Sequence, residues 1–369
     1  MADLNITPAR AGLVPVIWDA KFFTEYVRKS QFSKYFGTSM NSLIQVKDDL
    51  EAKRGDSVVF ATVRRLVGAG VTNNQILEGN EELLNARSLK LTIGLIRHAV
   101  AVSEWDEQKS ILDIRTAARD ALQIWALEKM RADVILSLGA MTADADVQVP
   151  YATATAGQRN TWLVNNTDRV LFGALTANHV SGVMATSLLT LDAAADKMTG
   201  AVLSLAKRRA KLANPRIRPI TVDNDEEWFV CFMPSMVFRD FRSDPVIINA
   251  TQNAWERGRD NPLFTGGDLL WDGIIIREIP ELPVIAGAGA AGVDVAMSFL
   301  CGAQALGISW AQRTKSTVNT RDYGGMHGVG ISEMRGFGKL RFGTDATVDG
   351  TAPKDAGLVT VFTTAASDA

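Results

Sequence analysis

Cysteine and histidine are both scarce in this sequence of 369 residues. The two cysteines, Cys231 and Cys301, lie far apart in apolar surroundings, which matches neither a disulfide framework nor a metal motif and favours a reducing compartment. The three histidines, His98, His179 and His327, are also widely separated and have no partner at i, i+4. Each is therefore interpreted as a structural polar residue rather than as a metal ligand or a catalytic base.

An excess of charge of one sign is missing too. The 39 basic and 41 acidic side chains leave a net charge of −2. This balance excludes a generally basic nucleic-acid binder, although not a local basic face. The 47% apolar and 22% charged residues are ordinary for a globular chain that can bury a large core in one to three domains.

The sequence has no convincing membrane or export segment. Its N-terminus lacks the basic start and apolar run of a signal peptide. Residues 295–312 carry no charge but contain Gln304 and Gln312, and their length is marginal for a membrane span. We expect a buried segment there and no membrane partner.

A glycine-rich run at residues 287–292 satisfies the pattern G-x-G-x-x-G, which can bind a dinucleotide when a helix follows. No acidic residue occurs between Asp294 and Asp322, so the carboxylate that would bind the ribose is absent. Asp294 would also repel phosphate. A flexible loop is favoured over a nucleotide site.

Other chemical motifs are weak or absent. An acidic cluster at Asp223, Asp225, Glu226 and Glu227 lacks the spacing of a calcium loop and is interpreted as a solvated turn. The chain has no P-loop, no G-x-S-x-G and no recognisable Cys/His pairing. We therefore predict no catalytic residue, no metal and no cofactor.

The most informative stretch is a long excursion followed by a long helix. A strand-like run at 56–66 leads into a polar segment at 67–88, and a second strand-like run follows at 89–102. In the second strand-like run, apolar residues occupy odd positions up to Leu95 and even positions after it. This change predicts a bulge, or a passage from an exposed hairpin to a strand that is buried on both faces. The polar segment has too little apolar surface to fold alone, so we expect it to become ordered by docking.

Residues 103–138 predict a helix of about 54 Å, capped by Ser103 and Asp106 and stopped by Gly139. Small residues in its apolar stripe favour packing against a sheet of the same subunit over a coiled coil. The predicted stripe comprises Ile111, Ile114, Ala118, Ala121, Trp125, Ala132 and Ile135.

The remaining segments are assigned more coarsely. Residues 1–40 are rich in aromatics and basic residues and form an arm, with an amphipathic helix at 19–32 that packs either on its own subunit or on a neighbour. Further expectations are a loop region at 142–167, a helix at 192–212, strands at 227–237, 273–279 and 328–342, turns at 253–271, and a weakly specified tail at 344–369.

Two sets of charged residues are candidate contact sites. The excursion carries Arg64, Arg65 and Arg87 at its sides and Glu78, Glu81 and Glu82 near its tip, which we take as candidate intersubunit contacts. A basic cluster comprises Lys207, Arg208, Arg209 and Lys211, followed by Arg216 and Arg218. Cations favour a helix C-terminus, and this explanation is preferred to contact with DNA phosphates, which stays open.

Several motifs carry a resemblance to a known family. They are Lys-Arg-Gly-Asp-Ser-Val-Val-Phe at 53–60, Leu-Glu-Gly-Asn-Glu-Glu at 77–82, Arg-His-Ala-Val at 97–100, Trp-Phe-Val-Cys at 228–231, Leu-Trp-Asp-Gly-Ile at 270–274 and Glu-Met-Arg-Gly-Phe-Gly-Lys at 333–339. Together they resemble a tailed-phage major capsid protein of the phage N-four type, within the Hong Kong 97 capsid fold, over roughly residues 15–343.

The resemblance implies an α+β fold with an N-terminal arm, an extended β-hairpin loop over an adjacent subunit, a peripheral domain with a long spine helix, and an axial domain. The implied divisions are 1–40 for the arm, 41–60 and 91–150 for the peripheral domain, 61–90 for the extended loop, 151–300 for the axial domain with its preceding loop region, 301–345 for the return to the peripheral domain, and 346–369 for the C-terminal tail.

The implied function is structural. Copies of the chain would form the pentamers and hexamers of an icosahedral phage head around double-stranded DNA, which they contact without sequence specificity. Portal, scaffolding and decoration proteins are further implied partners, and the virion, assembled in the bacterial host cytoplasm, is the implied location. An encapsulin-like protein compartment of the same fold is the nearer alternative, and a nucleotide-dependent enzyme using residues 287–292 the farther one.

Overall fold

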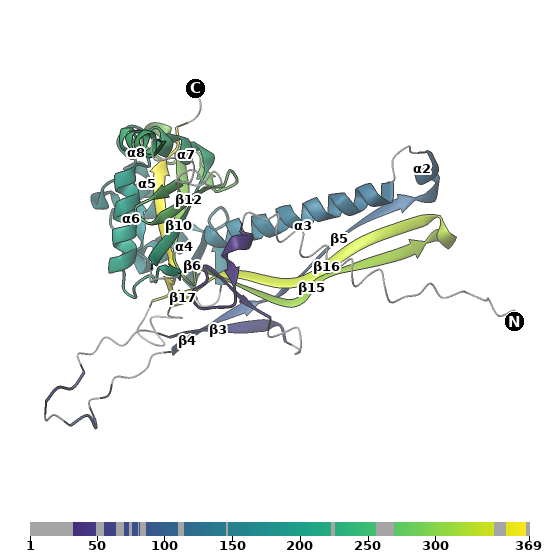
Figure 1. Cartoon of the computed structure of the whole chain (residues 1–369), viewed down its shortest axis with the longest axis horizontal. Helices are drawn as coiled ribbons and strands as arrows, with labels where there is room; N and C mark the ends of the chain where they lie inside the picture. Colours follow the sequence, from purple (N-terminus) through teal and green to yellow (C-terminus); the bar gives the residue numbers. More distant parts are fainter. Residues whose placement is uncertain are drawn as a thin grey trace.

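The computed structural model describes residues 32–48, 55–63, 70–73, 76–79, 81, 86–109, 114–144, 147–222, 226–255, 269–342 and 352–366. Figure 1 shows a compact body from which a long arm extends to one side, with the β3–β4 hairpin below it. The predicted helix at 19–32 lies outside the described residues except for Phe32, and the turn signals at 256–268 lie outside them entirely.

The body is built on an eight-stranded sheet with the order β11-β12-β10-β14-β19-β8, in which β13 also pairs with β14 and β9 with β10. Its strands are β8 (Val170–Phe172), β9 (Ile220–Val222), β10 (Glu226–Met233), β11 (Leu269–Trp271), β12 (Ile274–Glu278), β13 (Val284–Ile285), β14 (Val295–Cys301) and β19 (Leu358–Thr364).

Helices cover both faces of this sheet, so its central strands are buried on two sides. Along β19, Leu358 and Phe362 join one hydrophobic cluster while Val359 and Val361 join the other, as the two-residue period of a strand requires. The helices of the body are α4 (Ala156–Asn165), α5 (Met184–Leu189), α6 (Gly200–Leu212), α7 (Ser235–Arg242) and α8 (Pro245–Trp255), with short 3-10 turns η2 (Thr176–Asn178) and η5 (Ala290–Gly292).

The arm consists of a five-stranded sheet and two helices. The sheet has the order β1-β2-β15-β16-β5, and its strands are β1 (Phe36–Gly37), β2 (Ile44–Lys47), β5 (Gly94–Ser103), β15 (Leu306–Arg321) and β16 (Met326–Lys339). The 16 residues of β15 span about 53 Å. Helices α2 (Glu104–Lys109) and α3 (Ile114–Leu138) lie along it, with 3-10 turns η1 (Ser33–Tyr35) and η6 (Asp322–Gly324) at its two ends.

Helix α3 confirms the predicted packing on a sheet of the same subunit, since it contacts β16 and β5. The stop at Gly139 is confirmed, whereas Ser103 belongs to β5 and helix begins at Glu104. The buried residues of α3 include Ala118 and Ile135 of the predicted stripe, together with Leu122, Ala126, Met130, Val134, Ser137 and Leu138. Ala121 and Ala132 are exposed, so the predicted stripe is wrong there. Each i to i+4 step advances about 40° around the helix, so the buried face winds as the helix passes from arm to body.

The predicted excursion begins as a two-stranded hairpin of β3 (Ser57–Val63) and β4 (Ala86–Thr92). The second strand-like run divides at Ile93, where β4 leaves β3 and β5 continues on β16. This change of partner explains the change of parity. Burial on two sides is wrong for β5, because most of its residues are exposed in the single subunit.

The predicted loop at 142–167 is wrong in part. It contains β7 (Val147–Pro150), which pairs with β6 (Ala140–Asp144), and helix α4. A capping box between Thr155 and Gln158 begins that helix, and its Gln at the third position was hidden among Ala, Thr and Asn residues.

The ends of several other helices and strands differ from the prediction. Of the helix predicted at 192–212, only α6 forms, capped by Thr199. The strand predicted at 227–237 ends at Met233, because Pro234 precedes α7. Residues 295–312 are strands β14 and β15 with a buried turn, and the described part of the chain has no helix long and apolar enough to span a membrane.

The prediction of a weakly specified tail at 344–369 is wrong for residues 352–366. After β17 (Arg341–Phe342) pairs with β18 (Lys354–Asp355), β19 enters the body sheet between β14 and β8. Every residue of β19 is buried. Figure 1 shows this yellow strand running through the middle of the body. Its mostly apolar and β-branched residues suit a strand that is covered on both faces.

Candidate functional site

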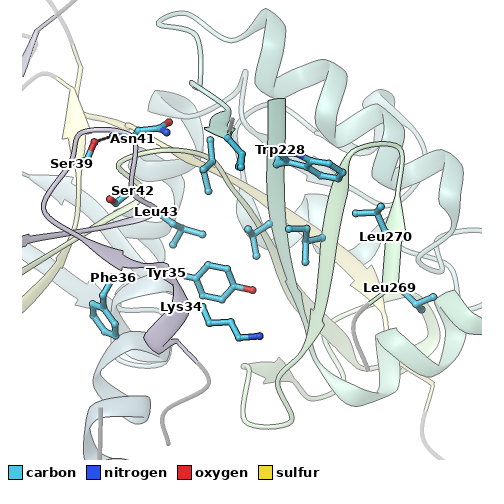
Figure 2. A pocket seen from close by; sticks show the side chains of 14 residues that line it. Lys34, Tyr35, Phe36, Ser39, Asn41, Ser42, Leu43, Trp228, Leu269 and Leu270 are labelled. Atoms are coloured by element: carbon cyan, nitrogen blue, oxygen red, sulfur yellow. Dashed lines mark hydrogen bonds between the residues drawn. The ribbon is translucent and has the colours of Figure 1, made fainter. Parts of the chain in front are cut away.

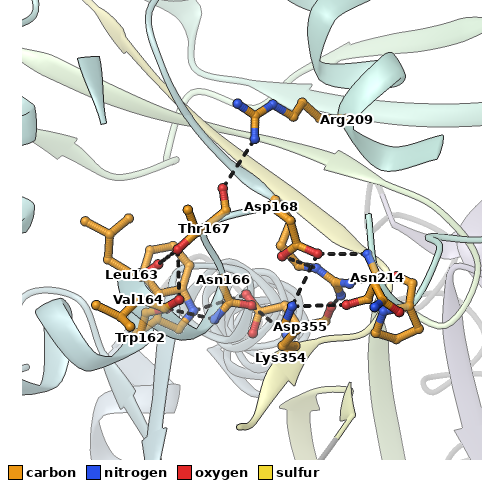
Figure 3. Close-up of polar contacts among 12 residues, drawn as sticks. Trp162, Leu163, Val164, Asn166, Thr167, Asp168, Arg209, Asn214, Lys354 and Asp355 are labelled. Atoms are coloured by element: carbon orange, nitrogen blue, oxygen red, sulfur yellow. Dashed lines mark hydrogen bonds and ion pairs between the residues drawn. The ribbon is translucent and has the colours of Figure 1, made fainter. Parts of the chain in front are cut away.

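A buried polar cluster holds the C-terminal segment against the rest of the chain. We define this C-terminal cluster as Trp162, Asn166, Arg169, Lys339 and Asp355. The ammonium of Lys339 lies 3.0 Å from Asp355 Oδ2, and the two side chains are 1% and 2% exposed. The indole N–H of Trp162 donates to the same carboxylate oxygen at 3.2 Å, and the Asp355 N–H donates to Asn166 Oδ1 at 2.8 Å (Figure 3). The cluster therefore joins β16, α4 and β18.

A second group of charges continues from this cluster toward the cis peptide bond Asn214–Pro215. The buried guanidinium of Arg169 donates to the Asp355 carbonyl and to the Pro215 carbonyl, and lies 3.4 Å from Asp168 Oδ1. Burial is the largest influence on Asp168 and raises its pKa. The opposing effects of Arg169, the Asn214 N–H and Lys354 together leave that pKa below its ordinary value. Asp168 therefore stays charged and ties the loop before β9 to β18.

A third polar group fixes the spine helix to the arm sheet. Arg335 on β16 is 2% exposed and bonds Asp133 of α3 at 2.8 Å and Glu333 at 3.2 Å. The indole N–H of Trp310 on β15 donates to Glu333 Oε1 at 2.7 Å. Because buried charges are costly without partners, this arrangement holds α3 in one position on β15 and β16.

The far end of the arm exposes large apolar side chains. Trp105 on α2 is 66% exposed, with the Lys109 ammonium 4.3 Å from the ring centroid. Val318, Tyr323 and Met326 at the end of the β15–β16 hairpin are exposed as well. Figure 1 places α2 and this hairpin end together, and the Glu104 N–H donates to the Gly325 carbonyl. An exposed apolar patch of this kind is typical of a surface that another molecule covers.

A mainly apolar pocket of about 630 Å³ lies where the start of the described chain meets the edge of the body sheet (Figure 2). We call it the edge pocket. It is lined by Lys34, Tyr35, Phe36, Ser39, Asn41, Ser42, Leu43, Ile220, Val222, Trp228, Val230, Leu269, Leu270 and Ile275. Its walls come from η1 and the following turn on one side and from β9 to β12 on the other.

The candidate intersubunit residues are only partly described. Glu78 and Glu81 are exposed at the tip of the excursion, and the Glu81 carboxylate accepts from the Gly79 N–H at 2.8 Å. Arg87 lies in β4 opposite Thr62. Arg64, Arg65 and Glu82 lie outside the described residues.

The basic cluster is largely neutralised within the subunit. Lys207 bonds Asp272, Lys211 lies 2.8 Å from Glu227, and Arg209 donates to the Thr167 carbonyl. Arg208 is exposed. These contacts are made with other elements of the same subunit, and both interpretations of the cluster stay predictions.

The glycine pattern at 287–292 leads into strand β14 rather than into a helix. Its first N–H groups are already used, because the Gly287 N–H donates to the Asp294 carboxylate at 2.8 Å and the Gly289 N–H to the Val293 carbonyl. The helix N-terminus that a dinucleotide site needs is therefore missing from this loop.

The other candidate ligands have structural surroundings. Asp223 and Asp225 lie outside the described residues, and Glu226 accepts from the Trp228 indole. The described residues contain no group of three His, Cys, Asp or Glu that could hold a metal ion. The His98 ring is tilted against Trp125, and the His179 ring packs edge-on against Phe172. His327 lies in β16 and pairs with Thr320 of β15.

The C-terminal cluster was missed at the level of the sequence. Its members come from residues 162 to 355, and no local pattern connects them. The signal that could have been used is the enrichment of β-branched residues and phenylalanine in Leu-Val-Thr-Val-Phe-Thr-Thr at 358–364, which is typical of a strand.

The body, the arm and the exposed arm end together define a structural, shell-forming subunit with the capsid fold of tailed phages. The family model described as phage capsid protein matches residues 9–367, and the chain belongs to this family. The chain is 29% identical to the major capsid protein of Pseudomonas phage KPP25 over 365 residues, which cover 95% of this chain and 94% of that protein.

Solved structures agree with this assignment. A chain of the cyanophage Pam1 capsid is 32% identical, with a TM-score of 0.81 and coverage of 93% of this chain and 94% of that one. A chain of the Ralstonia phage GP4 capsid is 24% identical, with a TM-score of 0.72 and coverage of 92% of both, and supports the fold alone. The predicted α+β Hong Kong 97 capsid fold is thereby confirmed.

Proposed function

We propose that this chain is the major capsid protein of a tailed bacteriophage with double-stranded DNA, and that its copies self-assemble as pentamers and hexamers of an icosahedral head. The single observation that carries this proposal is the arm. It extends far from the body and, among the described residues, exposes Trp105, Val318 and Tyr323 at its end, where another molecule can cover them. The capsid structures and the major capsid protein named above support it. The proposed role is structural, without catalysis.

The domain divisions of the family carry over as part of this proposal. The five-stranded sheet with α3 corresponds to the peripheral domain, assigned to 41–60, 91–150 and 301–345, and the eight-stranded sheet corresponds to the axial domain, assigned to 151–300. Strand β19 is assigned to the axial sheet as well, because it pairs there with β14 and β8. Residues 61–90 form the extended loop of the family. Residues 1–40 form its N-terminal arm, which is a different segment from the arm built by the five-stranded sheet.

Contacts between copies and with DNA follow from the same proposal. We assign Glu78 and Glu81, with Arg64, Arg65, Glu82 and Arg87, to contacts of the extended loop with an adjacent subunit. The exposed Arg208 is the member of the basic cluster best placed to meet packaged DNA by charge alone. Portal, scaffolding and decoration proteins remain proposed partners of the assembled head, which forms in the host cytoplasm.

Electron microscopy of the purified protein tests the proposal directly. Closed icosahedral shells are the expected result, and a stable monomer or dimer that binds a dinucleotide at 287–292 would overturn it. Nucleic acid inside particles isolated from infected cells distinguishes a phage head from an encapsulin-like compartment that holds protein. Deletion of residues 67–88 should abolish normal shells, and normal assembly of that variant would refute the role of the loop.

A further inference from the structure

We propose that the edge pocket receives the tip of the extended loop of a neighbouring copy, with Ile76 and Leu77 as the side chains that enter it. This inference rests on the proposed shell-forming function and names the surface on which the loop docks. The occupant is a second copy of this chain.

The edge pocket offers an apolar surface of suitable size. Its lining from the body sheet includes Val230, Ile275, Trp228, Leu269 and Leu270, of which Figure 2 labels the last three. A volume of about 630 Å³ is several times that of one aliphatic side chain, so two neighbouring side chains and part of their backbone fit within it. Burial there would remove apolar surface of both copies from water.

The loop tip offers the complementary surface. Ile76 and Leu77 are 73% and 61% exposed, although large aliphatic side chains are usually buried. Gly79 has a φ of 86°, and its N–H donates to the Glu81 carboxylate, which forms a local turn directly after the apolar pair. Two exposed aliphatic side chains therefore lie next to acidic groups in the chain at the tip.

The geometry requires a second copy. In Figure 1 the described tip residues lie beyond β3 and β4, away from the body that contains the edge pocket. From the end of β3 at Val63, the 13 residues to Ile76 reach at most roughly 45 Å. We therefore assign the tip to the pocket of a second copy.

Charge gives the docked loop an orientation. Lys34 is exposed on the wall formed by η1, and the guanidinium of Arg277 lies 5.7 Å from the centroid of the Tyr35 ring on the same side. Across the pocket, the Glu226 carboxylate accepts from the Trp228 indole at 3.2 Å. Glu78 and Glu81 of the incoming tip would therefore face Lys34 and avoid Glu226, which favours one register over its reverse.

Engineered cysteines test this contact in assembled particles. Leu77→Cys combined with Leu270→Cys should give a ladder of covalently linked chains after mild oxidation, seen on a non-reducing gel. Both native cysteines are buried and burial raises their pKa values, so the introduced thiols react selectively. Leu77→Cys combined with Leu212→Cys is the control, because Leu212 is 65% exposed but lies on α6, away from the pocket lining.

A ladder with the first pair and unlinked chains with the control pair is the expected result. Unlinked chains, or an intrachain disulfide, in well-formed shells of the first pair would overturn the inference while leaving the shell-forming function intact. Protection of Leu270→Cys from maleimide in the unassembled chain would also overturn it, because a segment of the same chain would then fill the pocket.

A second test introduces a charge at the tip of the extended loop and measures the yield of assembled shells. Leu77→Asp should lower the yield of shells at least about tenfold, since a carboxylate would replace an aliphatic side chain among the apolar residues that line the pocket. Leu175→Asp, at a residue with nearly the same exposure but outside the loop, should assemble normally. Thermal melting of both variants checks that they fold. Equal assembly of both variants would refute the docking, whereas failure of the wild type to form shells would refute the proposed function itself.

Discussion

Removal of the ammonium of Lys339 should destabilise the chain severely, because the buried carboxylate of Asp355 would lose its paired ammonium. The ion pair is 3.0 Å long and almost completely inaccessible, and the same carboxylate accepts from the Trp162 indole and interacts electrostatically with Arg169. Breaking such a pair by removing one partner costs about 3–5 kcal/mol. Domains are typically stable by only about 5–15 kcal/mol, so Lys339→Met should remove a large share of that stability.

Lys211→Met is the matched control. Lys211 lies 2.8 Å from Glu227, a shorter ion pair than that of Lys339, but both side chains are about half exposed. Exposed pairs contribute about 0–1 kcal/mol because water and salt screen them. The same chemical change at a comparable distance should therefore have a small effect, which isolates burial as the cause.

Urea unfolding of the unassembled chain, followed by tryptophan fluorescence, measures both effects. With a slope of about 3 kcal/mol per M, the midpoint should fall by about 1 M or more for Lys339→Met and by less than about 0.3 M for Lys211→Met. Addition of Asp355→Asn to Lys339→Met should recover much of the loss, because the amide is neutral and can still accept from Trp162. Equal shifts for the two single variants would refute the reasoning.

Three further outcomes follow from the same structure. Asp168→Asn should lower the melting temperature at pH 7, but the two melting curves should converge in acid. The reason is that the pKa of Asp168 is lower in the folded chain, so its contribution is present above the ordinary value of 3.8 and is lost as pH falls through the folded pKa. Leu122→Ala should cost about 2–5 kcal/mol in urea unfolding, whereas Ile124→Ala, on the exposed face of α3, should stay within about 0.5 kcal/mol. Cys231 and Cys301 should resist alkylation at pH 8 in the native chain and react after denaturation, because burial raises both thiol pKa values.

Patterns with a short period predicted much of the fold. The alternation at 89–95 and at 328–342 corresponds to β4, the start of β5, and β16, and the stop signal at Gly139 corresponds to the end of α3. These features depend on residues that are neighbours in the chain, so the sequence displays them directly. The error in the α3 stripe has a different origin, because the buried face follows the surfaces that the helix meets, and those come from distant strands.

The candidate contact residues could be predicted only as a charge pattern. Glu78 and Glu81 are at the exposed tip, as the polar composition of the excursion indicated, but the exposed apolar pair Ile76 and Leu77 beside them was not singled out. The edge pocket could not be predicted at all. Its walls bring Lys34 and Tyr35 next to Trp228 and Leu270, and only the folded topology places them together.

Strand β19 shows why the end of this chain matters for the whole subunit. It pairs in parallel with β8 and antiparallel with β14, so it joins segments that precede it by about 190 and 60 residues. Such long-range pairings form late, because the chain between them must be closed into a loop first. Without β19, the edges of β8 and β14 would be unpaired in the centre of the body, where exposed edges promote aggregation. The buried pair of Lys339 and Asp355 lies at the base of this strand, just after the arm strand β16 ends. Completion of the body sheet and fixation of the arm therefore depend on the same C-terminal segment, so a subunit that presents the arm in its final position has also closed its body.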